Sequence, residues 1–73
     1  MDPYQELANA IIVLAAKDYR SALRRMRKNG ENKIAADELR RLEQFFRSGW
    51  YEMLTDLDGE YLIKKLREEE NKK

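Results

Sequence analysis

The acidic turn "TDLDG" at residues 55–59 holds the side chains of this chain that most invite a metal-binding interpretation. An EF-hand loop places Asp or Asn two residues apart before an obligatory glycine and ends in a bidentate Glu six residues later. If Gly59 is that glycine, the first ligand position falls on Leu54 and the last on Lys65, and neither side chain coordinates calcium. The pattern therefore favours a helix cap, and we expect no bound metal and no cofactor.

Catalysis has few side chains to draw on. The 73 residues contain no histidine and no cysteine, which removes the commonest general base, the commonest metal ligand and the thiolate nucleophile. Glu52, Asp56, Asp58 and Glu60 offer paired carboxylates, but acid–base catalysis needs a cleft that raises the pKa of one of them by burial. The sequence predicts no such cleft, no base beside a serine or threonine, and no glycine-rich phosphate loop. We therefore expect a protein that is not an enzyme.

A stripe of basic side chains at helical spacing is the second chemical pattern. We call it the basic stripe, and it consists of Lys17, Arg20, Arg24, Arg27 and Lys28. It could follow a nucleic-acid backbone, contact an acidic protein, or remain a solvated face paired with acids of the second helix. A helix-turn-helix centred on Gly49 would make "WYEMLTDLD" the recognition helix, which is apolar and acidic where base contacts need Arg, Lys, Asn or Gln.

Charge is nearly balanced overall but unevenly distributed. Fifteen Lys and Arg face fourteen Asp and Glu, yet residues 17–47 carry ten basic and five acidic side chains, and both flanks are acidic. A second candidate group, Arg40, Arg47 and Tyr51, lies on the outer side of the second helix and has the composition enriched at interface hot spots. The alternative is a solvated helix face on which the tyrosine extends its hydroxyl to water. Such a chain can present a basic middle to an acidic partner.

The composition predicts helix almost throughout, because Ala, Leu, Glu, Lys and Arg are abundant and the only proline is Pro3. Asp2 is a good N-cap, Asn32 is another after Gly30, and the "TDLDG" turn can cap the last helix. We expect helices over about 3–28, 33–54 with a kink near 48–49, and 58–70, followed by a frayed tail at 70–73.

Apolar periodicity predicts which faces are buried. In the first helix one broad arc holds Tyr4, Ala8, Ile11, Ile12, Ala15, Tyr19, Ala22, Leu23 and Met26. The inner stripe of the second helix holds Ile34, Ala35, Leu39, Leu42, Phe45 and Phe46, and the same phase continues to Met53. We expect Phe46 and Trp50 to be mostly buried, and the whole chain, 1–73, to form a single all-α domain. It should be a small three-helix bundle, or three helices plus a short kinked segment, with one long N-terminal helix.

The N-terminal half of the first helix is apolar nearly all round. Leu7, Ala10, Val13 and Leu14 lie off the core arc, so something else should cover them. One solution is a homodimer through Leu7, Ala10 and Leu14 on an isologous patch. The other is that the loop near residues 54–58 and the last helix cover both sides within one chain.

No segment of the sequence predicts membrane insertion. The longest apolar run, "AIIVLAA" at residues 10–16, is far shorter than the ~20 residues that a membrane span needs. The start "MDPYQELANA" has neither a basic n-region nor a cleavage-like site. We therefore expect no membrane contact and an intracellular protein.

Two stretches, "AKDYRSAL" at 16–23 and "FFRSGWYEMLTDLDGEYLI" at 45–63, carry a family resemblance. The chain resembles a group of short proteins encoded by prophages and integrated mobile elements of Gram-positive bacteria. The resemblance implies an accessory role in the cytoplasm of a bacterial host and brings no enzymatic motif and no site residue. We expect a non-enzymatic helical adaptor or inhibitor that presents a charged surface to a host or defence protein. The alternative is a small nucleic-acid-associated regulator that uses the basic stripe.

Overall fold

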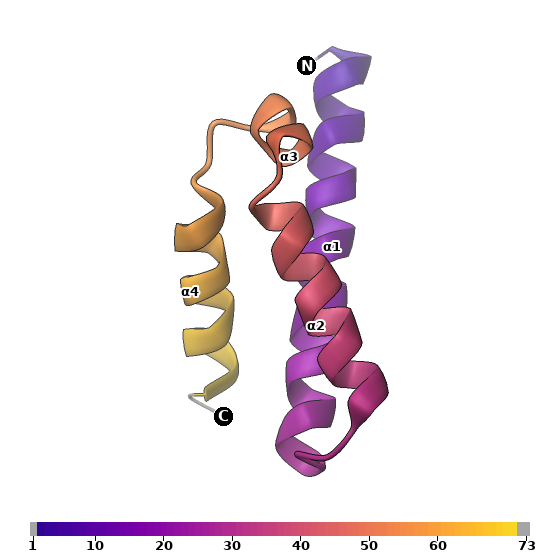
Figure 1. Ribbon diagram of the computed structural model, residues 1–73. Coiled ribbons are helices and arrows are strands. Elements are labelled where there is room, and N and C mark those ends of the chain that lie inside the picture. The colour runs from indigo at the N-terminus through magenta and orange to yellow at the C-terminus, as the bar shows by residue number, and fades with distance from the viewer. Residues whose placement is uncertain (1, 72–73) are drawn as a thin grey trace.

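The computed structural model describes residues 2–71, which form four helices and no strand (Figure 1). These are α1 (Pro3–Lys28), α2 (Lys33–Phe46), α3 (Gly49–Leu54) and α4 (Gly59–Asn71). The predicted all-α bundle with one long N-terminal helix is confirmed, because α1 alone has 26 residues. The fourth helix, α3, is the short segment beyond the expected kink.

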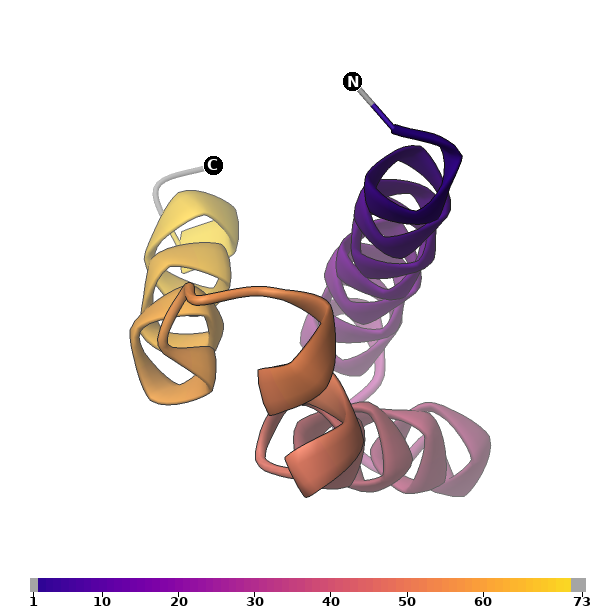
Figure 2. The same ribbon diagram turned by 90° about the horizontal axis from the view of Figure 1, so that it is seen from above.

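The helices α2, α3 and α4 all pack against α1. The chain runs along α1, returns along α2, and then passes through α3 to α4, which contacts both α1 and α2. Seen from above, α2 and α4 lie on different sides of α1 (Figure 2). The molecule is elongated, with Cα extents of 41 × 22 × 18 Å, and α3 lies near the N-terminal end of α1 (Figure 1).

Every helix begins directly after a capping side chain that accepts a hydrogen bond from a backbone N–H of the first turn. The caps are Asp2, Asn32, Ser48 and Asp58, at donor–acceptor distances of 2.8, 3.0, 3.1 and 2.9 Å. Such caps satisfy N–H groups that have no partner inside the helix. Local sequence therefore determines where the helices begin.

Ser48 also explains why the chain breaks between α2 and α3. Its hydroxyl donates to the carbonyl oxygen of Phe45 at 2.7 Å and accepts from the N–H of Tyr51 at 3.1 Å. Its backbone is extended, at φ −82° and ψ 159°. One side chain thus closes the end of α2 and opens α3, and the helical phase is reset between them.

This reset makes part of the predicted aromatic core wrong. Trp50 is 58% exposed and Met53 is 73% exposed, whereas Tyr51, expected on the outer side, is only 1% exposed. The prediction extended the apolar stripe of α2 through residue 53, which holds only if the helix is unbroken. The extended backbone of Ser48 rotates α3 relative to α2, so the side chains of α3 face other directions than the stripe predicts. The predicted burial of Phe46 is confirmed.

The core is built around two buried tyrosines and a phenylalanine. Phe46 makes edge-to-face contacts with Tyr19 and Tyr51, with both pairs of ring centroids 5.8 Å apart. Ile63 and Leu66 of α4 close this cluster. Two residues assigned to the core by periodicity, Tyr4 and Ile34, are exposed, since each lies in the first turn of its helix at an end of the bundle.

Gly59 is the point where the chain returns against the end of α2. A Cβ at this position would lie 1.9 Å from the carbonyl oxygen of Phe46, well inside van der Waals contact. Only glycine permits this approach, which places α4 beside the core. The last helix continues to Asn71, one residue beyond the expected end, and Glu70 is 3% exposed. Residues 72–73 of the expected frayed tail lie outside the described part of the chain, and the fraying stays a prediction.

Candidate protein-interaction surfaces

Acids of α4 neutralise most of the basic stripe. Arg20 pairs with Glu69 at 3.1 Å, and Arg24 and Arg27 pair with Glu70 at 3.3 and 3.9 Å. Arg27 also donates to the backbone carbonyl of Glu70. The expectation that acids of the second helix pair with this stripe is wrong, because α4 lies along that side of α1.

Lys17 and Lys28, at the two ends of the stripe, make no ion pair with any residue from 2 to 71. The α2 acid that reaches α1, Glu38, pairs with Arg25, which is not part of the stripe. A phosphate backbone or an acidic protein would therefore compete with carboxylates already in place on three of the five cations.

The predicted Tyr51, Arg40 and Arg47 cluster does not form. Tyr51 is buried, Arg40 pairs with Asp37 at 3.4 Å within α2, and Arg47 pairs with Glu60 at the start of α4. The break at Ser48 separates the tyrosine from the two arginines. This correction removes Tyr51 as a surface contact for a partner.

Glu43 lies at the centre of a polar network that joins three helices. The Tyr19 hydroxyl of α1 donates to Glu43 Oε2 at 2.5 Å, Arg67 of α4 donates to the same oxygen, and Arg47 lies 3.7 Å from Oε1. Burial by itself would raise the pKa of Glu43, but these hydrogen bonds and charges outweigh it and hold the pKa below its usual value. Burial and the hydrogen bond to Glu43 raise the pKa of Tyr19.

A carboxylate held ionised in this way is a poor proton donor, so the network fits a role in holding the helices together. Sequence reasoning missed it because Tyr19 and Glu43 are 24 residues apart, as are Glu43 and Arg67. Periodicity within one helix carries no signal for contacts at that separation.

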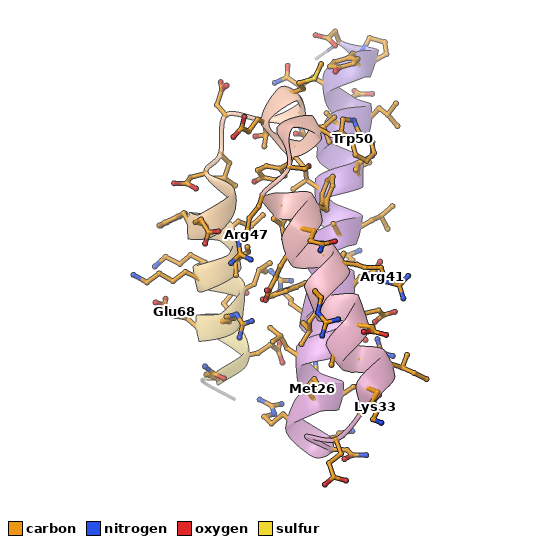
Figure 3. All side chains as sticks on the ribbon, viewed as in Figure 1. Met26, Lys33, Arg41, Arg47, Trp50 and Glu68 are labelled. Atoms are coloured by element: carbon orange, nitrogen blue, oxygen red, sulfur yellow. The ribbon has the colours of Figure 1, made fainter. Side chains whose placement is uncertain are left out.

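The end of the molecule where the start of α1 meets α3 combines exposed apolar side chains with carboxylates. We call it the acidic end, and define it by the exposed side chains of Asp2, Tyr4, Glu6, Trp50, Glu52, Met53, Asp56, Leu57 and Asp58. Residues 1–16 and 48–63 contain no lysine and no arginine. Trp50 projects from the side of α3 at this end (Figure 3). Its ring packs edge-to-face on that of Phe45, with ring centroids 5.4 Å apart.

Two open cavities flank the segment from Glu52 to Asp56. The larger, of about 730 Å³, lies between α3 and the start of α4 and is lined by Tyr51, Asp58 and Glu60 among others, and also by Arg47, whose charge is paired with Glu60. The smaller, of about 250 Å³, lies between α3 and the start of α1 and includes Met53 in its lining. Glu52, Thr55 and Asp56 line both. The acidic end is therefore hollowed on both sides of a carboxylate-bearing ridge.

Tyr51 contributes a buried hydroxyl to the wall of the larger cavity. This hydroxyl has no hydrogen-bond partner among residues 2–71. Burial and the nearby charge of Asp58 raise the pKa of Tyr51, so the phenol stays protonated at neutral pH. The sequence carried one readable signal for this end, the absence of basic residues from 48 to 63; only the fold shows that residues 2–6 lie beside it.

A third surface is the outer face of α1, which we define as Leu7, Ala10, Val13 and Leu14. Leu7 and Leu14 are 62% and 61% exposed, and the other two residues are also exposed. The alternative in which the loop near 54–58 and the last helix cover these residues within one chain is therefore wrong. The homodimer expected through Leu7, Ala10 and Leu14 stays a prediction.

No protein-family model, curated protein or solved structure matches the chain. Within residues 2–71, no three metal-ligating side chains are grouped so that they could hold an ion. None of the helices described is long and apolar enough to cross a membrane.

Proposed function

We propose that this protein is a non-enzymatic helical interaction protein that binds a basic, amphipathic segment of a protein partner at the acidic end. The observation that carries the proposal is the exposure of Trp50 and Met53 on α3, with Met53 lining a cavity together with Glu52 and Asp56, in a segment, 48–63, that contains no lysine or arginine. A mobile-element adaptor or inhibitor that acts on a host or defence protein in the bacterial cytoplasm is the biological role that we propose for this binding.

The chemistry of the acidic end suits such a segment. Tryptophan is the residue type most enriched at interface hot spots, and methionine adapts its shape to irregular apolar partners. An amphipathic helix can place its apolar face against Trp50 and Met53 while its lysines or arginines reach the ridge carboxylates. The exposed carboxylates would also steer a cationic partner during diffusion, which speeds association.

The charged surface expected from the sequence was the basic stripe, and its ion pairs with α4 argue for the opposite end. Within the stripe, the cations without such a pair are Lys17 and Lys28. Few free cations also weaken the nucleic-acid alternative, since affinity for a phosphate backbone grows with the number of phosphates neutralised.

The single tryptophan of the chain makes the proposal directly measurable. We would titrate the protein with a synthetic helical peptide of lysine and leucine that contains no tryptophan, and follow Trp50 emission. Binding should shift the emission to shorter wavelength, and affinity should fall between about 50 and about 300 mM salt, because exposed charges are screened. An unchanged emission at saturating peptide would contradict the proposal.

Charge reversal provides the matched control. Glu52→Lys combined with Asp56→Lys should weaken binding at least roughly tenfold, a change of about 1.4 kcal/mol. Asp18→Lys combined with Glu31→Lys makes the same change in net charge at exposed positions away from the acidic end, and it should leave affinity within about twofold once salt is raised. An equal loss of affinity in both variants would mean that binding depends only on net charge, and it would overturn the assigned site.

The nucleic-acid alternative has its own test with random duplex DNA. Reversing Arg20, Arg24 or Arg27 would break ion pairs with α4, so Lys17→Glu with Lys28→Glu is the cleaner variant. Salt-sensitive DNA binding that this double variant abolishes would favour the alternative. The genes that neighbour the coding sequence test the mobile-element role.

A further inference from the structure

The outer face of α1 forms a straight apolar strip with a charged residue at each end. Leu7, Ala10 and Leu14 follow one another at steps of three and four, which places them along one line of the helix. Glu6 precedes the strip and Lys17 follows it at the next step. Both are exposed, and neither forms an ion pair within the described chain.

The molecule exposes more surface than its mass predicts. Its solvent-accessible area is 5461 Å², whereas a compact monomer of this mass exposes about 4800 Å². The difference of roughly 700 Å² is close to the ~800 Å² that each partner buries in a standard interface. The helix α1 extends beyond the end of α2, and the apolar strip lies on the part that extends (Figure 1).

We propose that a second copy of this chain covers the strip, with the two α1 helices packed antiparallel about a two-fold axis near Ala10. A self-complementary apolar patch is what a two-fold interface requires. In this register Leu7 of one copy lies against Leu14 of the other. The small side chain of Ala10 at the centre allows the helices to approach to the short end of the usual 8–10 Å interaxial range.

Charge selects the antiparallel orientation. Glu6 and Lys17 lie on the same flank of α1, at opposite ends of the strip. Antiparallel packing brings Glu6 of one copy beside Lys17 of the other, twice by symmetry. Parallel packing about a two-fold axis would instead place the two copies of each residue on opposite flanks of the interface, so neither charge would meet a partner of opposite sign. The strip shares Glu6 with the acidic end but contains none of Trp50, Glu52 and Asp56, so the two proposals can fail independently.

Sedimentation or light scattering tests the assembly. At about 100 µM, well above the dissociation constant of a micromolar complex, the particle should have twice the chain mass of 8.8 kDa. Leu14→Lys should give a monomer with unchanged helical circular dichroism. Ser21→Lys adds the same charge on the same side of α1 but beyond the overlap, and it should remain a dimer. A monomeric parent protein, or a dimer that survives Leu14→Lys, would overturn the proposal.

Disulfide trapping tests the orientation, because the chain has no cysteine of its own. A mixture of the Leu7→Cys and Leu14→Cys variants should form a disulfide-linked heterodimer under mild oxidation. Neither variant alone should cross-link efficiently in the antiparallel register. Self-cross-linking of Leu7→Cys would indicate parallel packing, and a dimer that yields no heterodimer cross-link would place the interface elsewhere; both results contradict the proposal.

Discussion

Gly59→Ala places a methyl group where the backbone of α2 ends. The new Cβ would lie 1.9 Å from the Phe46 carbonyl oxygen and 2.9 Å from its carbonyl carbon. The obstacle is main chain and cannot rotate aside, so the start of α4 must move outward by more than an ångström. That movement separates Ile63 and Leu66 from the core cluster to which they belong.

We expect Gly59→Ala to lower the free energy of unfolding by about 3 kcal/mol, the upper part of the range for overpacked sites. A domain of this size has a total stability of only roughly 4–11 kcal/mol. Since 1 kcal/mol shifts the melting temperature of a small domain by roughly 4–8 °C, the midpoint should fall by about 12–24 °C. Thermal and urea unfolding followed by far-ultraviolet circular dichroism measure both quantities.

Gly49→Ala is the matched control. Gly49, like Gly59, is the first residue of its helix and follows a capping side chain, so both substitutions gain similar helix propensity. No atom lies within 4 Å of a Cβ at Gly49, and we expect a neutral effect or a gain of about 0.5 kcal/mol. If the two variants melt alike, the packing of the turn against Phe46 is wrong.

Two further predictions concern the core and its polar network. Phe46→Ala should lower the free energy of unfolding, measured in urea, by about 3–5 kcal/mol, whereas Trp50→Ala should lower it by less than about 1.5 kcal/mol because the indole is mostly exposed. Equal losses in the two variants would show that Trp50 is part of the core. Because the pKa of Glu43 is lowered in the folded state from its ordinary value of 4.5, its contribution to stability is present above that value and is lost as pH falls through the folded-state pKa. The stability difference between the parent protein and Glu43→Gln should therefore narrow below about pH 4.5, and a difference that stays constant down to pH 2 would show that Glu43 is not the coupled group.

For the acidic end and the apolar strip, the sequence predicted which residue types each surface contains better than it predicted where the surface lies on the molecule. The absence of lysine and arginine from residues 48–63 is visible in the sequence, as is the apolar strip from Leu7 to Leu14. That the N-terminal turn lies beside α3, and so forms one acidic end with it, depends on the return of the chain along α2 (Figure 1). The fold adds that no helix or loop within residues 2–71 covers this strip.

The helices themselves follow from interactions between residues close in sequence. Asp2, Asn32, Ser48 and Asp58 cap backbone groups two or three residues away, and helix propensity acts one residue at a time. For that reason the sequence alone determined that the chain is all-α and where α1, α2 and α4 begin, and the apolar periodicity of α2 placed Phe46 in the core.

Tertiary structure decided which side of each helix meets another. The extended backbone of Ser48 places Tyr51 in the core instead of Trp50. The position of α4 pairs Arg27 with Glu70, which is 43 residues away in the sequence. A periodic pattern reports the angle between side chains on one helix, but it contains no information on the rotation that a break or a loop introduces between two helices. That rotation is set by contacts such as the approach of Gly59 to Phe46, which exist only when the whole chain is folded.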